Sequence, residues 1–404
     1  MTKSTPLQAT DKPAKPRPDF PLFPHASGKW AKKIRGKMHY FGTWDDPQGA
    51  LEEYAKHRDR LHAGLGRDDG RGEPTVADMI NQFLESKRQL MLAGELSALT
   101  WRDYYETGVR MSKAFKRSRR LSELTPAIFD RYKADLAKTR SPGAVGNEVN
   151  RVRVICNWAF EQGPIEKPIR FGPAFKRPSK RVMRLERAKR GSRMFEAAEL
   201  KQLLEKASVP MKAMILLGVN CGLGNTDIAD LQERHLDLKR GWLDYPRPKT
   251  GIGRRCKLWP ETFEAIRAAM AMRPEPMSAA DADCIFLTDR GARYVVTRPR
   301  EGKSAVRTDS VRWEFNELLA ATNLKQAGLC FYGLRHCFET IGGESRDQVA
   351  VDICMGHVDP SMGAHYRERV SDDRLADVVK VVHAWLWPKD EQPATIPFNQ
   401  AAGG

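Results

Sequence analysis

The sequence predicts a mainly α protein with small β elements, divided into several structured regions. Long stretches place apolar residues at helical spacing, whereas strand-like alternation is confined to two short segments. A length of 404 residues favours two or three domains. A basic stretch almost devoid of apolar residues, at 176–193, marks the main boundary between them.

The composition favours an intracellular protein with an anionic partner. The chain has 68 Lys and Arg residues against 51 Asp and Glu, a formal net charge of +17, so nucleic acid is the first candidate partner. No long apolar run predicts a membrane span. The seven cysteines are scattered without a C-x-x-C pair, which argues against a disulfide framework and against a zinc site. We therefore expect a cytoplasmic location and reduced thiols.

The N-terminal region predicts an arm followed by a small strand–strand–helix unit. Residues 1–26 are rich in proline, lysine and threonine and lack a secretory signal, so we expect a disordered arm. Over residues 27–64, alternating apolar and basic residues around Gly36 predict a hairpin. Asp46 and Pro47 are expected to begin a helix after it. The exposed cations favour DNA binding over an ordinary charged surface.

Residues 74–175 predict a domain built from four helices. The first three begin near Thr75, Thr100 and Thr125, and the fourth follows the segment SPGAV. No convincing strand pattern occurs between them, and a basic run, KRSRR, lies at 116–120. The pattern indicates a helical domain with basic edges.

Residues 176–193 carry nine cations and one glutamate. Such a basic segment is suited to lie along phosphates, and a solvated hinge is the alternative. Residues 194–390 then predict a larger, mostly helical domain with a strand–turn–strand hairpin. We expect a looped insertion at 273–308 and a disordered tail at 391–404. The terminal apolar helix, VVKVVHAWLW, either closes its own domain or docks on a neighbouring protomer.

Three chemically active side chains are expected to converge in this domain. Arg335 lies near the start of a helix that has one buried face. Gly356 ends the next helix and places His357 on the turn after it. The Asp-Pro pair at 359–360 is expected to cap and begin the helix that carries Tyr366. Because the connections are short, the three side chains could meet at one point.

A tyrosine at such a point suits phosphoryl transfer. A phenol with a pKa near 10 leaves more readily than an alkoxide, so it can attack a phosphodiester and later be displaced. Neither metal nor cofactor is needed if cations stabilise the phosphorane charge. The ordinary alternatives are a surface tyrosine, an ion-paired arginine and a turn-capping histidine.

These segments resemble the motifs of the tyrosine recombinases of the phage-integrase family. YGLRHCFET is similar to the family box H-x-L-R-H-T-F-A-T, and MGH followed nine residues later by tyrosine is similar to its L-G-H…Y. PRPKTG aligns Lys249 with the lysine of the catalytic hairpin. The resemblance implies that Tyr366 is the nucleophile and Arg335 clamps the phosphate. It further implies that His357 hydrogen-bonds the phosphate or manages protons, and that Lys249 protonates the departing 5′ oxygen; a solvent-facing lysine is the alternative.

The resemblance also implies an architecture and partners. It would make residues 27–64 an arm-type DNA-binding unit, 74–175 a helical, SAM-like core-binding domain and 194–390 the catalytic domain. The implied activity is integration of a mobile element by a homotetramer on double-stranded DNA, through a 3′-phosphotyrosyl intermediate. DNA-bending or directionality proteins would be accessory partners, and the protein would associate with the nucleoid.

Two positions depart from the family pattern. The first family box, T-G-L-R-x-x-E-L, corresponds to CGLGNTDIADL, which places Gly224 where an arginine belongs, although Asp227 matches the acidic residue. Tyr332 stands where the second box usually has histidine, and a phenol can still hydrogen-bond a phosphate oxygen. A partner or a DNA-induced change could complete the site. The cations that could fill the space are Arg254, Arg255 and Arg247.

The missing arginine leaves two other functions open. A catalytically impaired, recombinase-like DNA-binding regulator is the alternative that Gly224 favours. A type IB topoisomerase would share the chemistry. The arm-like N-terminus and the linker favour recombination, and the four matched residues in register favour catalysis.

Overall fold

The computed structural model describes residues 12–62, 73–162, 165, 167–300, 303–359 and 361–388. Contacts divide the chain into two compact units, Met1–Leu185 with Pro299–Ala305, and Glu186–Arg298 with Val306–Gly404. The described residues form separate hydrophobic cores in the N-terminal, helical and C-terminal regions. All seven cysteines are free thiols. Among the described helices, none combines the length and apolar character that crossing a bilayer requires.

The N-terminal region is a three-stranded antiparallel sheet covered by one helix. The predicted hairpin is confirmed: Arg35 and Gly36 form its two-residue loop with φ of 49° and 79°, as a tight hairpin turn requires. The predicted helix start is also confirmed, because the Asp46 carboxylate accepts a hydrogen bond of 2.8 Å from the Gly49 amide. The elements are β1 (Phe23–His25), β2 (Lys29–Ile34), β3 (Lys37–Thr43) and α1 (Pro47–His62).

The structure differs from the expectation of a disordered arm over residues 1–26. Residues 1–11 lie outside the described residues, but the chain from Lys12 onward is described, and β1 pairs with β2. Phe20 and Leu22 are buried, and the Phe20 ring packs edge-on against Trp30 at a centroid distance of 5.0 Å. The proline-rich composition favoured a prediction of disorder, but Phe20 and Leu22 pack into the core of the N-terminal region.

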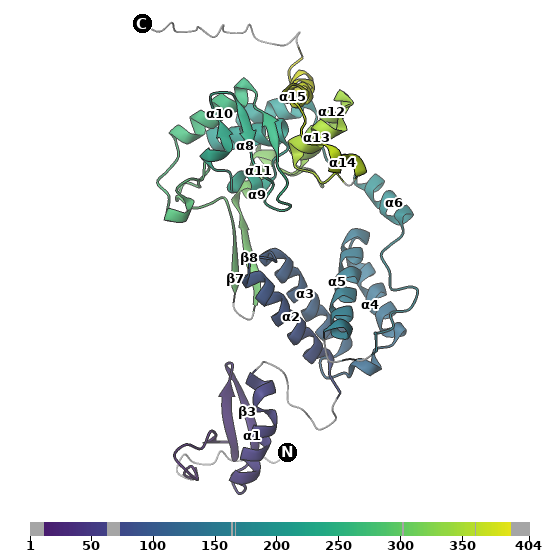
Figure 1. The fold of residues 1–404 in the computed structure, drawn as a ribbon, viewed down its shortest axis with the longest axis vertical. Helices are drawn as coiled ribbons and strands as arrows, with labels where there is room; N and C mark the ends of the chain where they lie inside the picture. The colour runs from purple at the N-terminus through teal and green to yellow at the C-terminus, as the bar shows by residue number, and fades with distance from the viewer. Residues whose placement is uncertain are drawn as a thin grey trace. The chain divides into compact units, whose positions relative to one another are not determined.

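The second region contains the four predicted helices. Thr75 begins the first with a capping box, exchanging hydrogen bonds with Asp78. In Figure 1, α2 and α3 lie side by side, and α5 packs against α2, α3 and α4. The helices are α2 (Val76–Leu92), α3 (Ala98–Phe115), α4 (Pro126–Thr139) and α5 (Pro142–Glu161).

A buried polar cluster joins three of these helices. The Glu148 carboxylate accepts bonds of 2.8 and 2.7 Å from the Arg110 guanidinium, 2.6 Å from the Tyr132 hydroxyl and 3.1 Å from the Thr107 hydroxyl. Burial alone would raise the pKa of Glu148, but the bonds from Arg110 and Tyr132 outweigh burial and lower it. The carboxylate is therefore ionised and fully engaged at neutral pH.

The basic segment contains helix α6 (Lys180–Arg190), which the sequence interpretation did not include. Helix α6 has no buried residue, so it contributes to no hydrophobic core. Its cations therefore project into solvent around the helix.

The C-terminal region surrounds the buried helix α8 (Val209–Cys221), against which α10, α12 and α15 pack (Figure 1). The predicted hairpin forms β5 and β6, and β4 extends it to three antiparallel strands. The remaining elements are α7 (Ala197–Lys206), α9 (Asn225–Ala229), β4 (Leu236–Asp237), β5 (Trp242–Asp244), β6 (Arg255–Lys257), α10 (Pro260–Ala271), β7 (Val295–Arg300), β8 (Lys303–Asp309), α11 (Ser310–Ala321), α12 (Gly333–Gly342), α13 (Gln348–Met355), α14 (Met362–Tyr366) and α15 (Asp372–Leu386).

Two expectations for this region need correction, and one open question is answered. The insertion at 273–308 is not only loop, because β7 and β8 pair within it. Helix α14 begins after Ser361 rather than at Asp359, whose carboxylate instead accepts a 2.9 Å bond from the Ser361 amide. Pro360 and the tail at 391–404 lie outside the described residues. The terminal helix α15 packs into the core of its own domain.

Candidate active site

Arg335 lies at the centre of the candidate site and is only 3% exposed. Its guanidinium donates to the carbonyl of Met355 at 2.8 Å and to the carbonyl of Gly222. These carbonyls belong to the C-terminal ends of α13 and α8, where Gly356 and Gly222 both take the left-handed conformation with φ of 63°. Helix C-termini carry partial negative charge, which compensates the buried cation.

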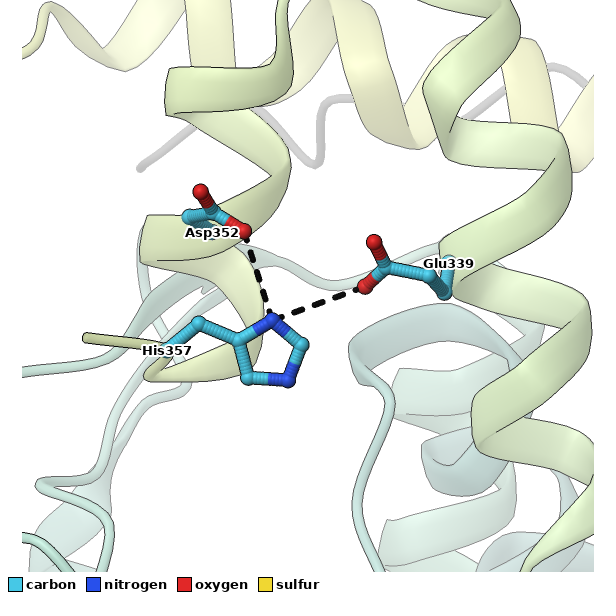
Figure 2. Close-up of side chains that lie close together, drawn as sticks. All are labelled: Glu339, Asp352 and His357. Carbon is cyan, nitrogen blue, oxygen red and sulfur yellow. Dashed lines mark hydrogen bonds and ion pairs between the residues drawn. The ribbon is translucent and has the colours of Figure 1, made fainter. Parts of the chain in front are cut away.

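The same guanidinium binds the His357 ring. Arg335 Nη2 lies 2.8 Å from His357 Nε2. Because a guanidinium only donates, Nε2 is the acceptor and the ring proton is on Nδ1. Figure 2 shows Nδ1 facing two carboxylates, Asp352 Oδ1 at 3.3 Å and Glu339 Oε2 at 3.6 Å. Two carboxylates thus fix the tautomer that hydrogen-bonds the arginine.

Glu339, Asp352 and His357 are also residue types that could hold a metal ion, and their candidate ligand atoms lie within 4.8 Å of one another. Each carboxylate already has protein partners, because Gln348 Nε2 donates to Glu339 Oε1 and to Asp352 Oδ1, both at 3.1 Å. The geometry is accounted for by orientation of the histidine ring.

Two more arginines approach the turn that carries His357. Arg247 Nη1 lies 3.5 Å from the carbonyl of Gly356. A Cβ atom on Gly356 would lie 3.4 Å from Arg254 Nε, so Arg254 reaches the same turn. Burial and the charges of Arg247 and Arg254 lower the pKa of Arg335 to about 10, although Tyr332 acts in the opposite direction. The three arginines concentrate positive charge around the turn that carries His357.

Gly224 is connected to this arginine cluster through Asp227. Its amide donates a 3.0 Å bond to Asp227 Oδ2, and the same oxygen lies 3.4 Å from Arg254 Nη2. A Cβ on Gly224 would lie 3.6 Å from the ring of Tyr332, which is 45% exposed. The structure therefore brings Gly224, Asp227 and Tyr332 together with Arg254, around the position where the family pattern has an arginine.

Arg255 does not join this group. Its guanidinium donates to Asp372 at 2.7 and 2.8 Å, and to Asp244. The hydrogen bond to Asp372 is the main cause that raises the pKa of Arg255. The hypothesis that Arg255 fills the space beside Gly224 is therefore wrong, because its charge is neutralised on another face of β6.

Tyr366 and Lys249 both lie at the surface. Tyr366 ends helix α14 and is 81% exposed, and α14 has no buried residue. Arg367 donates a 2.9 Å bond to Asp359, and this bond and that from Ser361 lower the pKa of Asp359 to about 2. Lys249 is exposed on the turn between β5 and β6. Within the described residues, neither side chain is hydrogen-bonded to Arg335, so the roles of Tyr366 and Lys249 stay predictions.

Sequence reasoning missed Glu339, Asp352 and Gly222. Glu339 follows Arg335 by one helical turn, at the i+4 spacing that places two side chains on one face, and this signal could have identified it. Asp352 precedes the helix-ending Gly356 by a similar interval. No local signal connects Gly222 with Arg335, because the contact spans two helices.

The fold is shared with solved integrases. A lambda integrase dimer bound to a COC′ core site matches with a TM-score of 0.53 and 14% identity, over 91% of this chain and 99% of that one. A lambda integrase tetramer bound to a Holliday junction matches with 0.52 and 16%, over 88% and 98%. The Tn1549 transposon integrase in complex with transposon right end DNA matches with 0.53 and 13%, over 76% and 99%.

At these identities the likeness concerns the fold, and at that level the resemblance read from the sequence is confirmed. No family model and no curated protein matches the chain.

Proposed function

We propose that this protein is a site-specific DNA recombinase of the integrase type, which cuts and rejoins DNA through Tyr366. The observation that carries the proposal is the pair formed by the buried Arg335 and the half-buried His357, bonded at 2.8 Å within a cluster of three arginines. Such a cluster suits a group with several anionic oxygens. The exposed phenol follows this pair by one short helix.

Double-stranded DNA is the substrate that the charge distribution supports best. The chain has a net charge of +17, and α6 offers cations on every side with no buried face. The lambda and Tn1549 integrases of similar fold were solved on DNA, one of them as a tetramer on a Holliday junction. We extend both properties, DNA binding and tetramer assembly, to this chain.

The chemistry requires no net change in bond energy. The Tyr366 oxygen attacks a backbone phosphorus, and the P–O bond to the 5′ oxygen breaks, leaving a 3′-phosphotyrosyl link. Lys249 gives the departing oxygen its proton. Arg335 donates to the non-bridging oxygens. His357 Nε2, released from Arg335, accepts the Tyr366 proton during the attack, and the resulting imidazolium, held by Asp352, donates to a phosphate oxygen. Attack by a 5′ hydroxyl on the phosphotyrosine reverses each step and rejoins a strand.

The exposure of Tyr366 fits a nucleophile that must reach an external duplex. Helix α14 is five residues long and buries no side chain, so little apolar area opposes its displacement. A hydroxyl enclosed in a core could not approach the phosphate. The proposal therefore requires α14 to bring Tyr366 to the arginine cluster when DNA binds.

Covalent capture tests the proposal. The Tyr366→Phe protein first enriches binding sequences from random duplexes, and these are rebuilt with a nick close to the expected cut, so that cleavage releases a short fragment and cannot reverse. Wild type should form a denaturant-resistant protein–DNA adduct. Tyr366→Phe should bind the same duplex without forming one, and Tyr40→Phe, at a tyrosine of the N-terminal sheet, should behave as wild type.

If wild type binds the enriched duplex and never links to it, the protein is a DNA-binding regulator with a recombinase fold. Relaxation of a supercoiled plasmid without exchange between duplexes would instead indicate a topoisomerase.

A further inference from the structure

Arg254 is a buried cation without a hydrogen-bond partner. The residue is 2% exposed, and within the described part of the chain Nε, Nη1 and Nη2 all lack an acceptor in bonding geometry. Asp227 Oδ2, 3.4 Å from Nη2, supplies opposite charge, and the Tyr245 ring lies 5.4 Å from the guanidinium carbon. The charge is thus partly balanced, while the donors remain unused.

An unused guanidinium in a protein interior calls for a physical explanation. Each guanidinium has five N–H donors, and buried donors in folded proteins almost always have acceptors. Arg335, which is equally buried, satisfies its donors with two carbonyls and the His357 ring. The donors of Arg254 are therefore available to a ligand that carries several acceptor atoms and negative charge.

The position of Arg254 identifies that ligand as the phosphate of the proposed reaction. Its Nη2 and the amide of Gly224 both approach Asp227 Oδ2. Its Nε lies beside Gly356, whose neighbouring Met355 carbonyl holds Arg335. A Cβ on residue 224 would lie 3.7 Å from Asp227 Oδ2, the same oxygen that Arg254 Nη2 approaches to 3.4 Å.

We infer that Arg254 supplies the second arginine to the scissile phosphate, from the β5–β6 hairpin and in place of a side chain at residue 224, with Asp227 holding it in position. This inference rests on the proposed function and names a phosphate-binding residue for it. In the complex, phosphate oxygens accept hydrogen bonds from the Arg254 N–H groups that have no acceptor in the free protein. Gly224 is then required to be small, because two arginines would compete for one carboxylate.

Cleavage rates of four variants test the inference on the nicked duplex described above. Arg254→Gln should lower the single-turnover rate by about 10²- to 10³-fold, the cost of one lost transition-state donor. Arg254→Lys should recover only part of the loss, because lysine keeps the charge without the planar fork. The matched control Arg255→Gln, one residue away and ion-paired elsewhere, should cleave as wild type. Arg254→Gln combined with Gly224→Arg should cleave faster than Arg254→Gln alone.

A wild-type rate in Arg254→Gln would overturn the inference while the adduct itself upholds the proposed function. A binding measurement covers the case in which no variant forms an adduct. In the Tyr366→Phe background, each central phosphate is replaced in turn by a neutral methylphosphonate. Arg254→Gln should weaken binding to the natural duplex. When the phosphate that Arg254 contacts is the one replaced, Arg254→Gln should cause no further loss of affinity. Equal effects of Arg254→Gln at every substituted position would exclude the contact.

Discussion

Two arginine–carboxylate pairs, one in each compact unit, use the charge of the arginine in opposite ways. In the helical domain, Arg110 donates two hydrogen bonds of 2.8 and 2.7 Å to the Glu148 carboxylate, and the Tyr132 hydroxyl donates a third. In the C-terminal domain, Arg254 faces Asp227 at 3.4 Å and no nitrogen of its guanidinium is bonded to the described residues. The first pair is saturated with hydrogen bonds within the fold, whereas the guanidinium of the second leaves its donors unused.

The number of hydrogen bonds that a charged side chain makes within the protein separates charges that hold the fold together from charges that are free to bind a ligand. Glu148 joins α3, α4 and α5, so its contacts are used continuously to hold the domain. Arg254 joins no pair of elements through hydrogen bonds, so its burial costs stability without supplying a connection. Removing Glu148 should therefore lower the stability of the helical domain, whereas removing Arg254 should raise the stability of the C-terminal domain and lower the rate of DNA cleavage.

The largest effect is expected from Glu148→Ala. Removing the carboxylate leaves the buried Tyr132 hydroxyl without this acceptor and takes two hydrogen bonds from the half-buried Arg110, which should lower the unfolding free energy of the helical domain by about 3–5 kcal/mol. Amide hydrogen exchange of α3 and α5 measures this loss, and Glu161→Ala at the exposed end of α5 is the matched control. If the amides of α3 and α5 exchange as slowly in Glu148→Ala as in wild type, Glu148 does not hold the helical domain together.

Arg254→Met should raise the unfolding free energy of the C-terminal domain, the opposite of the effect of Glu148→Ala. A methionine of similar length removes three buried nitrogens that lack acceptors, and Asp227 keeps its hydrogen bond from the Gly224 amide, so the C-terminal domain should gain about 1–3 kcal/mol. Hydrogen exchange of α8 and α12 measures the gain. Destabilisation as large as that of Glu148→Ala would mean that Arg254 is a structural residue after all.

A smaller effect is expected from Asp352→Ala, which tests the carboxylate beside His357. Without it, the His357 ring loses a partner that fixes its tautomer, and cleavage should slow by about 10-fold, as for other histidine-orienting partners. Noncovalent DNA affinity should stay the same. The control Asp377→Asn removes an exposed carboxylate that pairs with Lys380 on α15. Loss of affinity in Asp352→Ala would indicate a folding defect instead.

The smallest effect concerns the exposed cations of α6, in contrast to the buried ones. Arg181→Gln and Lys189→Gln should each reduce the slope of log affinity against log salt by about 1, because each removes one phosphate contact. Fluorescence anisotropy with a labelled duplex measures the slope. Lys380→Gln on α15 provides the control cation. Slopes equal to that of wild type would show that α6 lies away from DNA.

Much of the local structure followed from short-range signals in the sequence. Capping residues such as Thr75 and Asp46 set helix starts, and Gly36 set the hairpin, because these preferences depend on a few neighbouring atoms. Phe20 and the β7–β8 pair escaped prediction, because packing against distant residues outweighed a proline-rich or loop-like composition. The same division holds within the candidate site.

By itself the sequence determined the fold class and the spacing of Arg335, His357 and Tyr366, since both depend on periodicity and order along the chain. It left Arg254 and Arg255 equivalent. Only the tertiary structure separated them: adjacent residues at a strand point to opposite faces, so one is buried beside Asp227 and the other pairs with Asp372. Which of the two side chains lies beside Asp227 depends on how β6 packs against α13 and α15. These helices lie far along the chain, and no local sequence pattern encodes the contacts.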